Sequence, residues 1–156
     1  MTTYEVVKAT PEHAVDMAPR LRLADRAEIW ASSKATPTRT LLASIKESRW
    51  AFAGLVDGEP VCLFGIVPVG LIGPVAVPWL LATDAMERHA RMFLHRSRHT
   101  VAIMSQAYPL LVNYVDARNK VSIKWLKWLG FDIMEPVPHG SFGLPFHRFE
   151  MRTVNV

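Results

Sequence analysis

Runs of apolar residues bounded by turn residues recur along the chain, and each run has the length of a β-strand. Asp57-Gly58 separates two of these runs, and this dipeptide is the strongest short-range signal of a β-hairpin. The strands on either side of it should therefore be antiparallel neighbours. In chain order, the expected strands cover residues 4–9, 50–56, 59–67, 75–81, 110–115, 131–137 and 146–152.

Segments with helical patterns and helix-start residues separate these strands. Thr10 before Pro11 predicts an N-cap and a first helical residue, and Pro19 predicts the end of that helix or a kink. Asp84, with Glu87 three residues later, has the spacing of a capping box. The other expected helices cover 20–32, a segment beginning at Thr38 or Thr40, 84–107 with a candidate break near Ser97, and 119–129 before the C-cap residue Gly130.

The order of these elements predicts the fold class. A strand, helices and a hairpin come first, and strands and helices then alternate before a final pair of strands. This order favours a mixed α/β (α+β) fold, with a central, mostly antiparallel mixed sheet of about six to seven strands flanked by helices. No linker or internal repeat divides the chain, so we expect residues 1–156 to form a single domain.

Composition narrows the class of protein. Half of the residues are apolar and 21% are charged, which excludes a disordered tail. The net charge of +4 permits an anionic partner without demanding one. Cys62 is the only cysteine, so an intramolecular disulfide and a cysteine zinc cluster are both excluded.

Targeting signals do not stand out in the sequence. The first residues contain no basic segment followed by an apolar stretch, so we expect no secretion signal peptide. The apolar stretch 61–83 is broken by glycines and prolines, which favours buried strands over a membrane span. The expectation is a cytoplasmic protein with no membrane-spanning segment.

The segment from Asn119 to Phe131 carries a family resemblance. Asn119 opens a helix after a buried strand, Ser122 occupies a small-residue position, and Gly130-Phe131 closes the helix. This spacing resembles the N-x-x-A-x-x-x-Y-x-x-x-G-F pattern of the GNAT acetyltransferases, and the element order is similar over nearly the whole chain. The resemblance implies a GNAT-like fold and acetyl-CoA as a cofactor. Its implied binding residues are Leu80, Leu81, Ala82, Arg88, Arg91 and Asn119.

A second resemblance covers roughly residues 45–151. The segments 111–115 and 123–127, together with Asp57-Gly58-Glu59-Pro60 and the stretch 78–83, look like the internal virion protein A family of short-tailed phages. This resemblance implies a phage or prophage protein with a GNAT-like fold and a role in virion assembly. Its partners would be virion or host proteins, and it would lie in the host cytoplasm or in the virion.

The sequence departs from the GNAT pattern at two places. GNAT enzymes hold the cofactor pyrophosphate on a Q/R-x-x-G-x-G/A loop, but Arg91 and Phe93 occupy the glycine positions that follow Arg88. Asp84 and Glu87 place carboxylates near the same helix start. The tyrosine that protonates the departing thiolate in many members is replaced by Leu126, which cannot donate a proton.

Two functional hypotheses follow from these departures. In the first, the chain has lost the acetyl-CoA machinery and acts through protein contacts. In the second, it is an active acetyl-CoA-dependent N-acyltransferase in which Arg88 and Arg91 hold the phosphates. Asp84 and His139 are then the candidate bases, and Tyr114 is the candidate replacement acid. The alternative for Tyr114 is a half-buried strand tyrosine.

A third hypothesis, nucleic-acid binding, rests on residues 88–99, which contain four arginines, three histidines and no acid. The alternative for this segment is a solvated helix face. His95 and His99 are four residues apart, but no acidic ligand lies near them in the sequence, so we expect no metal site. Trp125 and Trp128, beside a set of lysines, are candidates for a partner surface.

Overall fold

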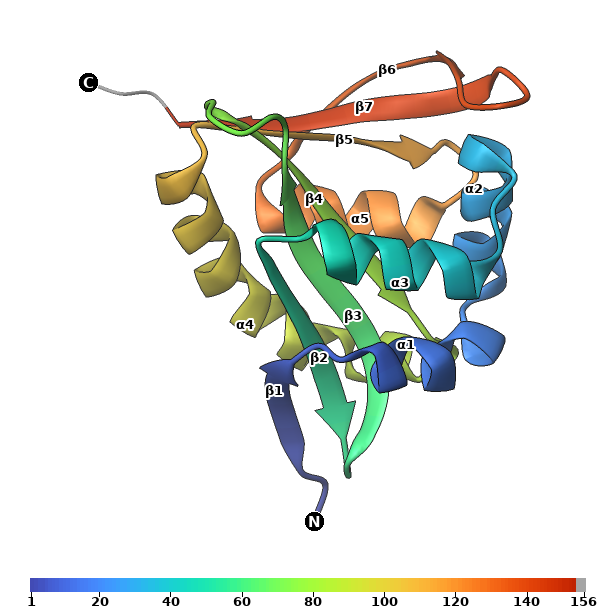
Figure 1. The fold of residues 1–156 in the computed structure, drawn as a ribbon, viewed down its shortest axis with the longest axis vertical. Coiled ribbons are helices and arrows are strands. Elements are labelled where there is room, and N and C mark those ends of the chain that lie inside the picture. The colour runs from blue at the N-terminus through green and yellow to red at the C-terminus, as the bar shows by residue number, and fades with distance from the viewer. Residues whose placement is uncertain (154–156) are drawn as a thin grey trace.

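The computed structural model describes residues 1–153, and it places seven strands in one sheet (Figure 1). The order of the strands in the sheet is β1-β2-β3-β4-β5-β7-β6. All neighbouring strands are antiparallel except β4 and β5, which are parallel. The strands are β1 (Tyr4–Lys8), β2 (Trp50–Val56), β3 (Glu59–Pro68), β4 (Val75–Ala82), β5 (Leu110–Asp116), β6 (Asp132–His139) and β7 (Leu144–Arg152).

Helices cover both faces of the sheet, which confirms the predicted mixed α/β class. In Figure 1, α1 and α3 lie in front of the sheet and α5 lies behind it. The described residues contain no helix with both the length and the apolarity needed to span a membrane. The helices are α1 (Pro11–Met17), the short 3₁₀ helix η1 (Ala18–Arg20), α2 (Leu23–Ser33), α3 (Pro37–Glu47), α4 (Asp84–Ala107) and α5 (Lys120–Leu129).

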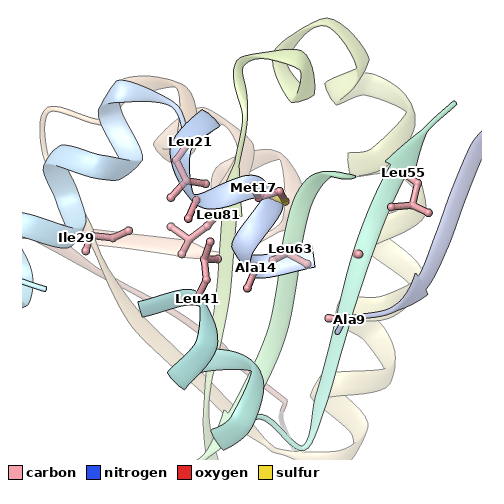
Figure 2. Packing of buried hydrophobic residues seen from close by; sticks show 11 residues of the cluster. Ala9, Ala14, Met17, Leu21, Ile29, Leu41, Leu55, Leu63 and Leu81 are labelled. Atoms are coloured by element: carbon pink, nitrogen blue, oxygen red, sulfur yellow. The ribbon is translucent and has the colours of Figure 1, made fainter. Parts of the chain in front are cut away.

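Alternate residues of the central strands supply the two buried layers. Leu63 of β3 packs with Met17 of α1 and Leu41 of α3, and Figure 2 shows these side chains converging on one face. Its neighbour Cys62 points the other way and packs with Phe93 of α4 and with Trp125 of α5. The sheet is therefore buried on both faces where its central strands lie.

The hairpin and the last helix form as the sequence predicts. Asp57 and Gly58 both have positive φ, 50° and 80°, as a two-residue hairpin turn requires. The Asn119 side chain accepts a hydrogen bond from Ser122 N–H at the start of α5. Gly130 ends this helix with φ 102°, in the left-handed region that favours glycine.

Three predicted helix features are wrong. The N-cap of α4 is Thr83 instead of Asp84, and no side chain caps it, because Thr83 continues the extended backbone of β4 and bonds to Val61 O. There is no break at Ser97, whose hydroxyl donates to Phe93 O one turn earlier. The helix expected at Thr38 or Thr40 begins at Pro37, because the Thr36 hydroxyl accepts the Arg39 N–H.

Candidate active site

A gap opens in the sheet between β4 and β5. The two strands pair only through Val75 with Leu110 and Ala76 with Leu111, and they separate beyond that point. A cavity of about 500 Å³ fills the gap. Its walls come from α2 and α3 on one face of the sheet and from α4 and α5 on the other, so it crosses the sheet.

The backbone of β4 faces this gap at every second residue. Thr83 N–H donates to Val61 O of β3, so residues at odd positions of β4 pair with β3 and those at even positions face β5. The carbonyl of Pro78 accepts a hydrogen bond from Asn113 Nδ2 across the gap, at 2.8 Å. The N–H and carbonyl of Leu80 are thus directed into the cavity, which Leu80 also lines.

Arg22 lies behind the cavity wall, where it contacts residues at the starts of α4 and α5. Its side chain is 3% exposed and lies 4.9 Å from the centre of the Trp125 ring. The guanidinium donates to four groups: Glu87 Oε1 at 3.0 Å, Asp25 Oδ1 at 3.2 Å, Asn119 Oδ1 at 3.2 Å and Ser122 Oγ at 3.2 Å. The sequence analysis missed both Arg22 and Asp25.

Asp25 joins this network to the backbone of β4. Its Oδ2 accepts the Ala82 N–H at 2.9 Å, and the Ala82 carbonyl accepts the Arg22 N–H at 2.9 Å. Burial raises the pKa of Asp25, although the charge of Arg22 and the hydrogen bond from Ala82 act to lower it. Both polar backbone groups of Ala82 are therefore engaged inside the protein.

Glu28 is a second carboxyl at this site that the sequence did not point to. It follows Asp25 by three residues on α2, lines the cavity, and accepts the Asp116 N–H on Oε1 at 2.6 Å. Burial raises its pKa from 4.5 to about 7, with smaller contributions from the charges of Asp25 and Asp116. A carboxyl with that pKa can take up or release a proton at neutral pH. The helical spacing of Arg22, Asp25 and Glu28 is the sequence signal that could have identified this face.

The structure brings two of the sequence-predicted residues together on the cavity wall. The rings of Tyr114 and His139 are stacked, with centroids 3.9 Å apart and an interplanar angle of 9°. The rings of His139 and Phe146 pack edge to face, with centroids 5.1 Å apart. Tyr114 and His139 therefore share the cavity with Glu28.

The predicted charged residues of α4 lie away from the cavity. Asp84 is exposed in the first turn of α4, and Arg88 and Arg91 are exposed further along that helix. Leu81 lines the cavity but is also part of the hydrophobic core on the α1 and α3 side. Asn119 is buried in the network of Arg22.

The tryptophans and the cysteine have distinct environments. Trp125 is buried, whereas Trp128 is 40% exposed and carries the Arg98 guanidinium 3.8 Å above its ring. Cys62 is buried, and burial raises the pKa of its thiol to about 12, so it is a packed thiol. The described residues contain no group of three histidine, cysteine or acidic side chains that could share a metal ion.

No protein-family model and no curated protein matches this chain. Solved structures do match. YncA of Salmonella typhimurium, a proposed acetyltransferase whose structure contains acetyl-CoA, is 14% identical with a TM-score of 0.72, over 99% of this chain and 96% of that one. A proposed acetyltransferase of Acinetobacter baylyi is 17% identical with a TM-score of 0.73, over 98% and 94%.

A GNAT-family acetyltransferase of Streptococcus pneumoniae is 10% identical, with a TM-score of 0.65, over 97% of this chain and 100% of that one. The similarity extends over nearly the full length of each structure. At these identities it establishes the architecture and no specific activity. The chain has the GNAT fold.

Proposed function

We propose that this chain transfers the acetyl group of acetyl-CoA to the nitrogen of an amine. The observation that carries the proposal is Glu28, whose carboxyl group has a pKa of about 7 and lines the cavity between β4 and β5. General base catalysis at neutral pH is most efficient when such a group lies close to the reacting nitrogen. The presence of acetyl-CoA in the YncA structure, on the same fold, supports the choice of acetyl donor.

The inner part of the cavity fits the acyl arm of acetyl-CoA. Apolar side chains such as Val77 and Leu94 line it, and the Leu80 N–H and carbonyl could pair with an amide as a neighbouring strand would. The start of α4 has no glycine cradle, so Arg88 and Arg91 remain the residues that we predict to hold the phosphates. When bound, acetyl-CoA would supply a thioester carbon to which the amine nitrogen bonds as the carbon–sulfur bond breaks.

Glu28 is positioned to take the proton that the amine must lose. The Asp116 N–H holds Oε1, which leaves Oε2 to accept this proton. Tyr114 is a phenol on the same cavity wall, and we propose it as the donor that returns a proton to the leaving group. Its stacking on His139 holds the phenol ring in place.

The first sequence hypothesis, a role in virion assembly through virion or host proteins, stays a prediction. One observation favours the loss of acetyl-CoA binding that this hypothesis assumes: Glu87 and Arg22 form an ion pair at 3.0 Å beside the start of α4. A carboxylate in the first turn occupies the place where the helix dipole would favour a phosphate. The alternative therefore predicts that acetyl-CoA does not bind.

Calorimetric titration with acetyl-CoA, followed by a thiol-release assay with a panel of amines, tests the proposal. We expect micromolar binding by the wild-type protein and by Glu28→Gln, with acetyl transfer reduced about 100-fold or more in the variant. The wild-type rate should rise with pH through about 7 as Glu28 ionises. The exposed Glu135→Gln variant is the matched control and should keep the wild-type rate. Absence of binding at millimolar acetyl-CoA would overturn the proposal.

A further inference from the structure

The charged groups on the cavity wall are acidic and have no basic counterpart. Glu28 of α2 and Glu47 of α3 both line the cavity, and within residues 1–153 His139 is the only histidine that does so. Among the described residues, neither a lysine nor an arginine lines the cavity. A ligand that enters between α2 and α3 therefore meets carboxylates without a compensating cation.

Glu47 belongs to a polar face of α3. Thr40, Ser44 and Glu47 recur at intervals of four and three residues, which places them on one side of the helix, and all three line the cavity. Two hydroxyl groups and a carboxylate therefore form this wall. Glu47 is exposed, so it lies at the rim, whereas Glu28 is partly buried.

Four basic residues on neighbouring elements have partners of their own. Arg22 is ion-paired with Asp25 and Glu87, and Arg118 is ion-paired with Asp116. Arg49 stacks on the ring of Trp50 at 4.8 Å, and Lys34 lies 5.1 Å from the ring of Phe142. None of these four cations lines the cavity, so a carboxylate on a ligand would be desolvated there without an ion-pairing partner.

We propose that the acetyl acceptor is a diamine or related polycation that carries no carboxylate group. Its reacting ammonium would sit at Glu28, and its second ammonium would be held at the rim by Glu47. The role of this amine as acetyl acceptor rests on the proposed acetyl transfer. The preference of the cavity for a cation without a carboxylate does not depend on that reaction. An α-amino acid would be repelled because the same wall that attracts its ammonium also repels its carboxylate.

Three small amines that differ by one charged group test the inference. Relative to 1,5-diaminopentane, lysine adds only a carboxylate, and pentylamine lacks only the second ammonium. We expect kcat/KM for acetyl transfer to be highest for the diamine, lower for pentylamine, and at least about 100-fold lower for lysine. Calorimetric titration of each amine into the protein without acetyl-CoA should give the same order of affinity.

Variants of α3 identify the rim carboxylate. Glu47→Gln should weaken diamine binding about threefold, as expected for an exposed ion pair, and leave pentylamine binding unchanged. Lys46 is an exposed neighbour of Glu47 that does not line the cavity, so Lys46→Gln is the matched control. It should change neither the affinity for the diamine nor the affinity for pentylamine. Ser44→Arg adds a cation to the cavity wall. We expect it to reduce the difference between the binding affinities for lysine and for the diamine.

The titrations and the kinetics separate failure of this inference from failure of the proposed function. If acetyl-CoA does not bind but the diamine binds more tightly than lysine, acetyl transfer is wrong and the charge preference of the cavity stands. If lysine binds as tightly as the diamine, or the diamine does not bind at all, the inference is overturned, whatever the protein does with acetyl-CoA.

Discussion

The proposed chemistry of the cavity depends on a single carboxyl group, that of Glu28. The carboxyl acquires a pKa of about 7 because burial disfavours its charged form, and the Asp116 N–H offsets only part of that effect. The sequence analysis instead selected Asp84, which lies exposed in the first turn of α4. Nearness in sequence to the expected cofactor loop does not identify a base, because the environment of a carboxyl group in the folded protein sets its pKa.

The raised pKa of Glu28 predicts a pH-dependent stability. An unfolded carboxyl titrates near 4.5 and the folded one near 7, so between these values the folded state binds more protons than the unfolded state. The contribution of Glu28 to the free energy of unfolding therefore falls as pH rises from about 4.5 to 7, by at most about 3 kcal/mol. Above about pH 8 it is constant, because the carboxyl is then ionised in both states.

Urea denaturation of the wild-type protein and of Glu28→Gln at pH 5, 6, 7 and 8 measures this contribution. The variant should gain stability relative to the wild-type protein up to about pH 7, because glutamine has no charge to desolvate. Both proteins contain the groups whose pKa is lowered, such as Asp116 and Glu150. Subtracting one pH profile of the free energy of unfolding from the other therefore cancels the contributions of those groups. Two parallel profiles would show that the folded carboxyl titrates near its ordinary value.

At the scale of elements, the sequence predicted most of the strands and helices but not how they meet. The hairpin at Asp57-Gly58, the strand before Asn119 and the end of α5 at Gly130 follow from local rules and are confirmed. The network around Arg22 joins residues up to 100 positions apart, through Ser122 as well as Asn119. No local pattern predicts which buried acid will pair with such an arginine. The spacing of Arg22 and Asp25 is informative only because α2 lies beside the gap between β4 and β5.

This junction of α2, α4 and α5 predicts a large loss of stability when Arg22 is removed. Arg22→Met would leave Asp25 buried and without its cation, which typically costs about 3–5 kcal/mol. Arg26→Met is the matched control, because Arg26 is exposed on the same helix and makes only a 3.5 Å contact to the Pro19 carbonyl. Urea denaturation compares the two variants, and equal stabilities would mean that the Arg22 network does not hold the three elements together.

Across the whole molecule, the acidic residues that line the cavity and the basic segment of α4 lie on opposite faces of the sheet. The acidic cavity wall is formed by α2 and α3, whereas no acidic residue occurs between Arg88 and Val115 on the opposite side. Arg88 and Arg91 are exposed, and neither belongs to an ion pair among the described residues. A cationic acceptor and an anionic donor would thus approach from opposite faces, each toward charge of the opposite sign.

The exposed Arg88 and Arg91 therefore predict how substitutions in α4 change the affinity for acetyl-CoA. Replacing both Arg88 and Arg91 with alanine should weaken acetyl-CoA binding about tenfold and leave acetyl-pantetheine, which lacks the nucleotide phosphates, unaffected. Arg96→Ala is the control, since Arg96 lies on another side of the helix and contacts Tyr4 O. Calorimetry with both ligands measures the difference.

The same double variant tests whether the anion that binds to Arg88 and Arg91 is the cofactor or a nucleic acid. If α4 is a nucleic-acid surface, duplex DNA should bind with an affinity that falls steeply between 50 and 200 mM salt, and the double variant should reduce that slope by about two. Acetyl-CoA affinity would then be unchanged in the variant. Because Arg98 is already held over the Trp128 ring and donates to the Trp128 carbonyl, Arg88 and Arg91 are the residues free to contact phosphate in either case.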